Sequence, residues 1–222
     1  YQRRAVPDGY FIYVFHCAGG VWLVAVAFKS KACAVIVVVL SGPESAGKST
    51  LCAALAQRFN APVVKEYVRE FIEHQQRDTC YADISPIAQQ QLQRELDARA
   101  QCPALLLLDT HLLSNKLWSE VLFNKSPAWI ASTLLELPYD LIGLLSPEGL
   151  PWQADGQRCQ PDLLERQQFH QALNAWLQTH QQPILHLTGS WQARYMQLES
   201  AISALLNNHT STSSSSTTRP LL

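Results

Sequence analysis

The eight residues 42–49, GPESAGKS, have the types and spacing that bind a triphosphate, because they match G-x-x-x-x-G-K-[ST] throughout. Gly42 and Gly47 let the backbone turn tightly around an anion, so that successive N–H groups converge on the phosphates. Lys48 supplies a mobile positive charge for the β and γ phosphates, and the Ser49 hydroxyl is placed to bind Mg²⁺. We therefore predict ATP and Mg²⁺ as the cofactors. The predicted nucleotide-binding residues are Gly42, Pro43, Glu44, Ser45, Ala46, Gly47, Lys48, Ser49 and Thr50.

Asp109 is the candidate partner for the metal. It follows four leucines at residues 105–108, so its carboxylate is predicted at the carboxyl end of a buried strand, where ligands bind in such sheets. This strand–Asp pairing is typical of the acid that holds the Mg²⁺ water shell. The alternative is an Asp that caps a helix starting after Thr110. We predict Ser49 and Asp109 as the metal-binding residues.

A possible acceptor site follows the second predicted strand, where residues 66–70 have the sequence EYVRE. A carboxylate at Glu66 could take a proton from a hydroxyl nucleophile, and Arg69 could hold a polar substrate or a phosphate. The alternative is a solvated helix start in which Glu66, Arg69 and Glu70 form local ion pairs. Sequence leaves open whether Glu66 or Asp109 takes the proton.

Residues 151–158, PWQADGQR, and the later Arg166 form a second polar cluster, between a predicted strand and a long predicted helix. A mobile flap with Arg158 and Arg166 could close over the transferring phosphoryl oxygens, stabilise their charge and exclude water. A solvent-exposed connection is the alternative.

These side chains need an alternating set of strands and helices to position them. Short apolar runs predict strands at 34–40, 63–66, 104–108, 141–145 and 184–187. Helices are predicted at 49–59, 85–100, 163–180 and 190–206, the second starting at Ser85-Pro86. The pattern indicates an α/β class: a P-loop nucleoside-triphosphate hydrolase or kinase fold, with a five-stranded parallel sheet, helices on both faces and a lid.

The two ends of the 222-residue chain differ from this middle, which we assign as one domain at 33–206. Residues 1–32 are an apolar leader of uncertain role. Within them, residues 10–28 carry no Asp, Glu, Lys or Arg, a length that suits a membrane span or an uncleaved signal. Their β-branched and aromatic residues also suit a hairpin, and a poorly ordered leader is our preferred interpretation. Residues 207–222, rich in Ser and Thr, are predicted to be disordered.

The net charge and the cysteine pattern limit the classes of partner and the cellular compartment that we expect. Lys and Arg number 17 against 18 Asp and Glu, a net charge of −1, which argues against a nucleic-acid partner or an anionic membrane surface. The six cysteines are scattered without a C-x-x-C pair, so we expect no zinc knuckle or disulfide scaffold and a reducing, cytoplasmic location. The guanine-specific N-K-x-D pattern is absent, because residues 115–118 and 124–127, NKLW and NKSP, lack the Asp. What remains is a small-molecule kinase or a compact regulatory ATPase.

Several motifs together resemble the NadR-like kinase domain, the ribosylnicotinamide kinase of bacterial NAD salvage. They are GPESAGKST, KEYVREF, the Asp109-Thr110 pair, YDL at 139–141 and PWQADGQR, in the family's order across residues 33–206. The resemblance implies transfer of the ATP γ-phosphate to the 5′-hydroxyl of nicotinamide riboside, giving nicotinamide mononucleotide. The catalytic residues it implies are Lys48, Glu66, Asp109, Arg158 and Arg166. The acceptor-binding residues it implies are Glu66, Tyr67, Arg69, Asp109, Trp152 and Asp155, with Tyr67 and Trp152 as candidates to stack on the cationic pyridinium ring.

The chain departs from the family in one respect. Full-length members carry an adenylyltransferase domain before the kinase, and here 33 residues without an H-x-G-H motif precede the first predicted strand. We therefore expect no synthesis of NAD from the mononucleotide and no binding of operator DNA. Two alternatives stay open: a regulatory nucleotide-binding module in which hydrolysis switches a partner, and a deoxynucleoside or nucleotide kinase. The acceptor's identity and the oligomeric state also stay open.

Overall fold

The computed structural model describes residues 2–6, 10–17, 20–24 and 34–214, and its centre is a five-stranded sheet. The strand order is β5-β6-β4-β7-β8, and every pairing is parallel. The central strand β4 is a run of six buried residues, as the apolar, β-branched sequence predicts. The strands are β4 (Ile36–Ser41), β5 (Val63–Val64), β6 (Leu105–Asp109), β7 (Leu141–Leu145) and β8 (Ile184–Leu187).

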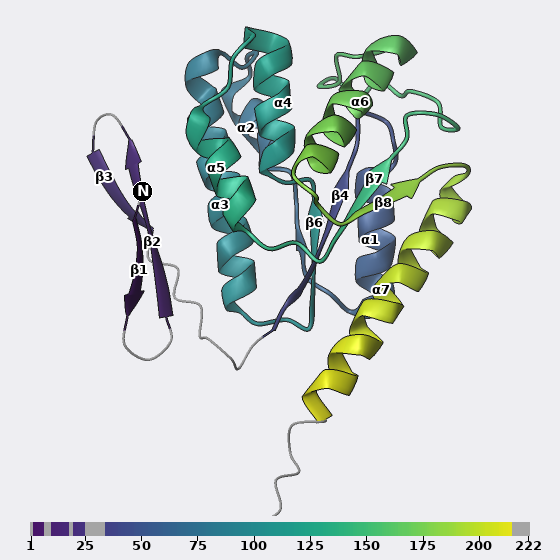
Figure 1. Ribbon diagram of the computed structural model, residues 1–222. Coiled ribbons are helices and arrows are strands. Elements are labelled where there is room, and N and C mark those ends of the chain that lie inside the picture. Colours follow the sequence, from purple (N-terminus) through teal and green to yellow (C-terminus); the bar gives the residue numbers. More distant parts are fainter. Residues whose placement is uncertain (1, 7–9, 18–19, 25–33, 215–222) are drawn as a thin grey trace, which may run out of the picture.

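Helices cover both faces of this sheet, so the predicted α/β class and three-layer architecture are confirmed (Figure 1). Successive strand residues point to opposite faces. Val37 and Val39 therefore pack in one hydrophobic cluster with α3 to α6, and Val38 and Leu40 pack in a second cluster with α1 and α7. The helices are α1 (Lys48–Phe59), α2 (Tyr67–Gln75), α3 (Tyr81–Ala100), α4 (Leu112–Phe123), α5 (Ala128–Glu136), α6 (Leu163–Thr179) and α7 (Trp191–Ser214).

Helix α3 begins earlier than predicted. Its N-cap is Cys80, whose N–H donates to the Asp83 carboxylate at 2.8 Å, and Asp83 also pairs with Arg77 at 2.7 Å. This capping box satisfies the first turn, so the helix is already under way at Ser85 and Pro86 lies inside it. The prediction that Ser85-Pro86 starts the helix is therefore wrong.

The N-terminal strands form a separate antiparallel sheet in the order β1-β2-β3. They are β1 (Gln2–Val6), β2 (Tyr10–Cys17) and β3 (Gly20–Val24). At residues 10–17 and 20–24, where the backbone is described, the chain thus forms the antiparallel strands expected of the hairpin in our alternative, and not the poorly ordered leader that we preferred. Residues 25–28 lie outside the described part of the chain. Among the described residues, no helix combines the length and apolarity needed to cross a membrane.

At the other end, α7 continues to Ser214, so the prediction of disorder is wrong for residues 207–214. No Gly or Pro interrupts these residues, and each residue added to an existing helix gains a backbone hydrogen bond. Residues 215–222 lie outside the described part.

Cysteine chemistry is mixed. Cys52, Cys80 and Cys159 are free thiols, whereas Cys102 is disulfide-bonded. A reducing compartment does not predict that bond at Cys102.

Candidate functional site

The loop between β4 and α1 has the backbone that a phosphate cradle requires. Gly42 has φ +153°, and a Cβ on it would lie 2.7 Å from the Leu145 carbonyl oxygen. Gly47, the N-cap of α1, has φ +84°. Side chains are strained at both positions, so the two glycines of the motif are needed where the structure has them.

Lys48 lies at the centre of a charged cluster. Its Nζ donates to the carbonyl oxygens of Gly42 and Pro43, both at 2.8 Å. Burial lowers the pKa of Lys48, while the nearby charges of Glu66 and Asp109 act in the opposite direction. Burial raises the pKa of Glu66, and Lys48 opposes that shift. The structure therefore brings together a cation and the two carboxylates between which the sequence could not choose.

Asp109 and Ser49 are the candidates for a Mg²⁺ site shared with a nucleotide. Asp109 is the last residue of β6 and pairs in register with Leu40, two residues before the phosphate loop. The N-cap of α4 is His111, so the alternative that Asp109 caps this helix is wrong. Among the described residues, no group of three or more His, Cys, Asp or Glu could hold a metal. One carboxylate and one hydroxyl still suit Mg²⁺ in phosphoryl-transfer sites, because substrate phosphates and water supply the other ligands.

Glu66 is the N-cap of α2, and its carboxylate makes no capping hydrogen bond to the helix. Arg69, one turn later, lies with its Nε 3.3 Å from Glu66 and its Nη1 2.7 Å from Asp155. The local Glu66–Arg69 ion pair of our alternative is thus present, and it extends to a third charged residue 86 positions along the chain. The Arg94 guanidinium lies 4.6 Å from the centroid of the Tyr67 ring, so only the other face of Tyr67 is left for stacking.

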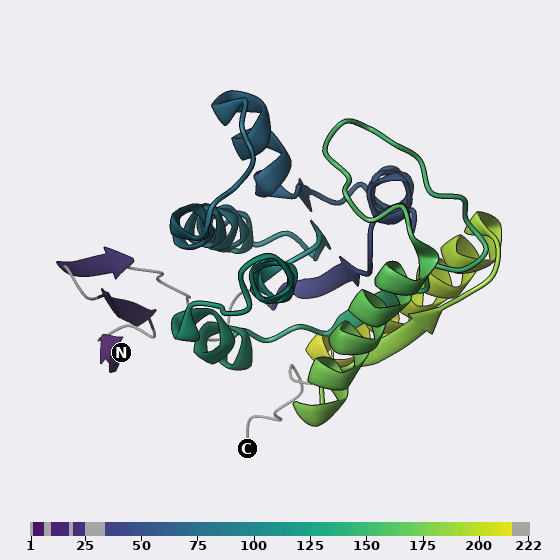
Figure 2. The ribbon, with the colours of Figure 1, turned by 90° about the horizontal axis from the view of Figure 1, so that it is seen from above.

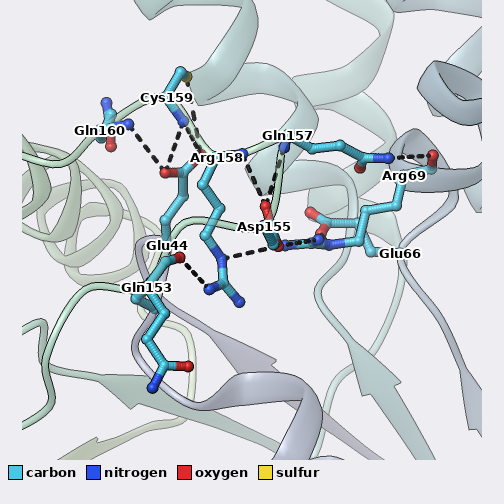
Figure 3. Close-up of polar contacts among 10 residues, drawn as sticks. Glu44, Glu66, Arg69, Gln153, Asp155, Gln157, Arg158, Cys159 and Gln160 are labelled. Atoms are coloured by element: carbon cyan, nitrogen blue, oxygen red, sulfur yellow. Dashed lines mark hydrogen bonds and ion pairs between the residues drawn. The ribbon is translucent and has the colours of Figure 1, made fainter. Parts of the chain in front are cut away.

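Residues 146–162, which we call the lid, connect β7 to α6 as a long loop (Figure 2). The backbone N–H groups of Cys159 and Gln160 donate to the Glu44 carboxylate at 3.1 and 3.0 Å, as Figure 3 shows. The Gln153 N–H donates to the Ser45 hydroxyl at 3.1 Å. The lid is therefore fastened to the phosphate loop at two residues of that loop. Most of residues 151–159 are nevertheless solvent-exposed, as the alternative of an exposed connection expected.

The lid also contacts Arg69 in α2. Asp155 pairs with Arg69, and the Gln157 side-chain amide donates to the Arg69 carbonyl at 3.2 Å (Figure 3). Arg158 is held inside the lid, because its Nε lies 3.1 Å from Asp155 and its Nη1 donates to the Gln153 carbonyl at 2.6 Å. One segment thus spans the phosphate loop and α2.

Arg166 and Trp152 carry buried donors without partners. Arg166, in α6, is 5% exposed, and its Nε and Nη1 make no hydrogen bond within the described part of the protein. The Trp152 Nε1 is likewise buried and unbonded. Leaving a buried donor unpaired is costly, so orphaned donors of this kind fit an anionic ligand.

Several residues that shape the site belong to no motif in the sequence. The Gln91 side chain, in α3, accepts the Tyr67 N–H at 2.7 Å and so fixes the start of α2. Arg194, in α7, donates to the carbonyl of Ala46 in the phosphate loop at 3.1 Å. Both residues lie in helices with many polar residues, so the sequence alone suggests that they face solvent. Glu44 was predicted as a nucleotide-binding residue, and what the sequence did not indicate is that its carboxylate accepts the lid's N–H groups.

Comparison with known proteins points to one group. A family model described as an AAA domain matches residues 37–194. The trifunctional NAD biosynthesis/regulator protein NadR of Escherichia coli strain K12 is 29% identical over 140 residues, 61% of this chain and 34% of the relative. NadR of Salmonella typhimurium is 27% identical over 154 residues, 68% of this chain and 37% of the relative. The chain therefore spans about a third of the length of these curated relatives, and its resemblance to the NadR-like kinase domain is confirmed.

Solved structures agree on the fold. A crystal structure of NadR protein in complex with NR superposes with a TM-score of 0.62 at 23% identity, covering 76% of this chain and 50% of that one. A second, in complex with NAD and AMP-PNP, gives a TM-score of 0.59 at 21% identity, covering 78% of this chain and 50% of that one. At this identity the likeness shows the P-loop fold.

Proposed function

The chain belongs to the AAA domain family, and from that premise we propose that it is an ATP-dependent kinase of a nucleoside-like small molecule. Nicotinamide riboside is the acceptor that we place first, because the NadR relatives resemble this chain and one such structure holds NR. The proposal rests above all on the Glu66 carboxylate, which lies beside Lys48 and is linked through Arg69 to the lid. A regulatory ATPase needs neither a carboxylate with a raised pKa near Lys48 nor a lid that is bonded to α2 as well as to the phosphate loop.

In the proposed reaction, the acceptor hydroxyl oxygen attacks the γ-phosphorus and the bond to the β-phosphate oxygen breaks, so that ADP leaves. The hydroxyl proton passes to a carboxylate. Glu66 is the better candidate, because its raised pKa makes it a stronger base than an exposed glutamate, and Asp109 then serves the metal. Bound Mg²⁺ would offset phosphate charge at Ser49 and Asp109.

The remaining residues position and stabilise. Lys48 and the loop N–H groups hold the phosphates, and the unpaired Arg166 donors offer hydrogen bonds to the phosphoryl oxygens. Arg158 and Asp155 keep the lid shaped over the site, which excludes water from the transfer. Trp152 and the free face of Tyr67 suit a cationic pyridinium ring.

The test is ADP release in a coupled assay with a panel of acceptors: nicotinamide riboside, deoxynucleosides and mononucleotides. We expect release to depend on nicotinamide riboside, and Lys48→Ala or Asp109→Ala to lower kcat/KM by at least ~10²-fold, because each removes charge stabilisation of the transition state. Lys116→Ala is the matched control, since this lysine pairs with Glu120 in α4 and should leave turnover unchanged.

Each other outcome has a distinct meaning. Wild-type turnover in the Lys48 or Asp109 variant would contradict the site. Dependence on a deoxynucleoside alone would change the acceptor and keep the kinase. Release that no acceptor stimulates would favour the regulatory ATPase.

A further inference from the structure

Arg194 is a fully buried cation whose hydrogen bonds meet three segments of the nucleotide site. It lies in the first turn of α7 and has 0% exposed surface. Its Nη1 donates to the carbonyls of Ala46, in the phosphate loop, at 3.1 Å and of Ser146, at the lid's start, at 2.8 Å. Its Nε donates to the Gly189 carbonyl at 2.9 Å, and its Nη2 donates to the Glu148 carbonyl.

The partners of Arg194 are backbone carbonyls, and no carboxylate among the described residues lies within salt-bridge distance of it. Burying a guanidinium is expensive, and a neutral side chain of similar volume often stabilises a fold as well or better. Packing alone therefore gives no reason for an arginine here. Carbonyls satisfy its N–H groups but leave its positive charge in place beside the phosphate loop.

The bond to Ala46 also orients the loop. In a planar trans peptide the C=O and the following N–H point in opposite directions. Because Arg194 holds the Ala46 carbonyl, the Gly47 N–H must point away from Arg194. Loop N–H groups of this kind bind phosphate oxygens, so Arg194 acts on phosphate through the backbone that it fixes.

We propose that Arg194 is a positioning residue for the triphosphate: it fixes the peptide before Gly47, ties the lid's first residues to the phosphate loop, and adds positive charge behind it. The inference rests on the nucleotide half of the proposed function and extends it to a residue outside the recognised motifs. It does not involve the acceptor, since none of the four carbonyls belongs to α2.

The test compares Arg194→Met, Arg194→Lys and a matched control in the full chain. Arg58→Met is the control, because it removes a largely exposed arginine that links α1 to α7 through Glu199 at 2.6 Å, away from the phosphate loop. Calorimetry gives the Kd of Mg–ATP and of Mg–ADP, and amide hydrogen exchange is followed at residues 42–50 and 146–162. Steady-state assays give KM for each substrate.

We expect Arg194→Met to raise the Kd of Mg–ATP at least ~10-fold and that of Mg–ADP less. Exchange should quicken at residues 42–50 and at the lid's first residues, 146–149, while residues 151–160 keep their bonds to α2 and exchange as in wild type. KM for ATP should rise while KM for the acceptor stays within about twofold, a split that general destabilisation would not produce. Arg194→Lys keeps the charge but cannot bond all four carbonyls. Its Kd for Mg–ATP should therefore lie between those of wild type and Arg194→Met, at least ~3-fold above wild type. Arg58→Met should match wild type.

An Arg194→Met protein with wild-type Kd for Mg–ATP would overturn the inference. If that variant does not fold, Arg194→Lys decides: a raised Kd supports the inference and an unchanged Kd overturns it. Wild-type protein that binds Mg–ATP but phosphorylates no acceptor would contradict the kinase while leaving the Arg194 comparison intact. Wild-type protein that binds no Mg–ATP would overturn both.

Discussion

Glu66 shows how one residue's surroundings can set its chemistry. It caps α2 beside Lys48 and Asp109, and burial is the largest cause of its raised pKa. Asp109 adds to the rise, whereas Lys48 and Arg69 oppose it. A base acts only when ionised, and its efficiency increases as its pKa approaches the working pH. The same burial that weakens Glu66 as an ion therefore strengthens it as a proton acceptor.

This predicts a specific pH dependence. Activity should fall as the pH drops through the Glu66 pKa, so the acidic limb of kcat/KM should lie above the range of an exposed glutamate. Glu66→Gln should lower kcat by about 10²–10⁴-fold and remove the limb. The measurement is the pH profile of both proteins, with Glu73→Gln, an exposed position on the same helix, as the control. A limb that persists in Glu66→Gln would assign the base to Asp109.

Stability should respond in the opposite sense. A raised folded-state pKa means that folded Glu66 holds its proton more tightly than the unfolded chain does. Its contribution to stability is therefore present at low pH and lost as the pH rises through the folded pKa. Glu66→Gln should not lower Tm at neutral pH, and a clear drop would show that the Lys48 and Arg69 contacts outweigh burial.

At the scale of elements, the strands and helices that were predicted correctly are those with a strong local sequence pattern. The strands carry continuous apolar runs and the phosphate loop carries a fixed motif, so β4, β6, β7 and β8 were predicted within two residues at each end. The start of α3 was not, because the Cys80–Asp83 cap competed with a stronger-looking Ser85-Pro86. The lid's residues were identified, but its fastening to Glu44 joins positions 115 apart, and no local pattern encodes such a contact.

The lid gives a prediction at this scale. Asp155→Asn should remove its ion pair with Arg69, which is part-exposed, so the free energy of unfolding should fall by no more than ~1 kcal/mol. Hydrogen exchange across residues 151–160 should nevertheless quicken, and KM for the acceptor should rise several-fold, because only the Gln157 bond to the Arg69 carbonyl then holds the lid on α2. Asp97→Asn is the control, because it removes an exposed charge on α3 while its Oδ1 can still accept from Gln93. Unchanged exchange in Asp155→Asn would show that the lid does not depend on this pair.

Across the whole molecule, parallel topology explains why distant residues meet. All five strands run the same way, so the segments after β4, β5 and β6 emerge at one edge and carry the phosphate loop, Glu66 and Asp109 there. The alternation of strands and helices in the sequence predicts a parallel sheet, and therefore predicts that these residues gather at one edge. It could not predict Arg194, because that contact requires α7 to return beside β4, and only the packed second cluster fixes this.

The phosphate loop lies at one edge of the sheet, and Leu134 packs in the hydrophobic cluster of α3 to α6. Ligand binding can test whether the nucleotide site depends on that cluster. Saturating Mg–ATP at about 100 times its Kd should stabilise the folded state by ~2.7 kcal/mol, or roughly 5–10 °C in Tm for a chain of this size. Lys48→Ala should abolish that increment. Leu134→Ala leaves a cavity in the α5 side of the core, where Leu134 is 1% exposed, and should cost about 2–5 kcal/mol yet keep the full increment. Thermal melts with and without Mg–ATP measure both effects. If Mg–ATP does not stabilise Leu134→Ala, the phosphate loop depends on the layer of helices that contains α5. If Mg–ATP does not stabilise the wild-type protein, the nucleotide-site assignment is wrong.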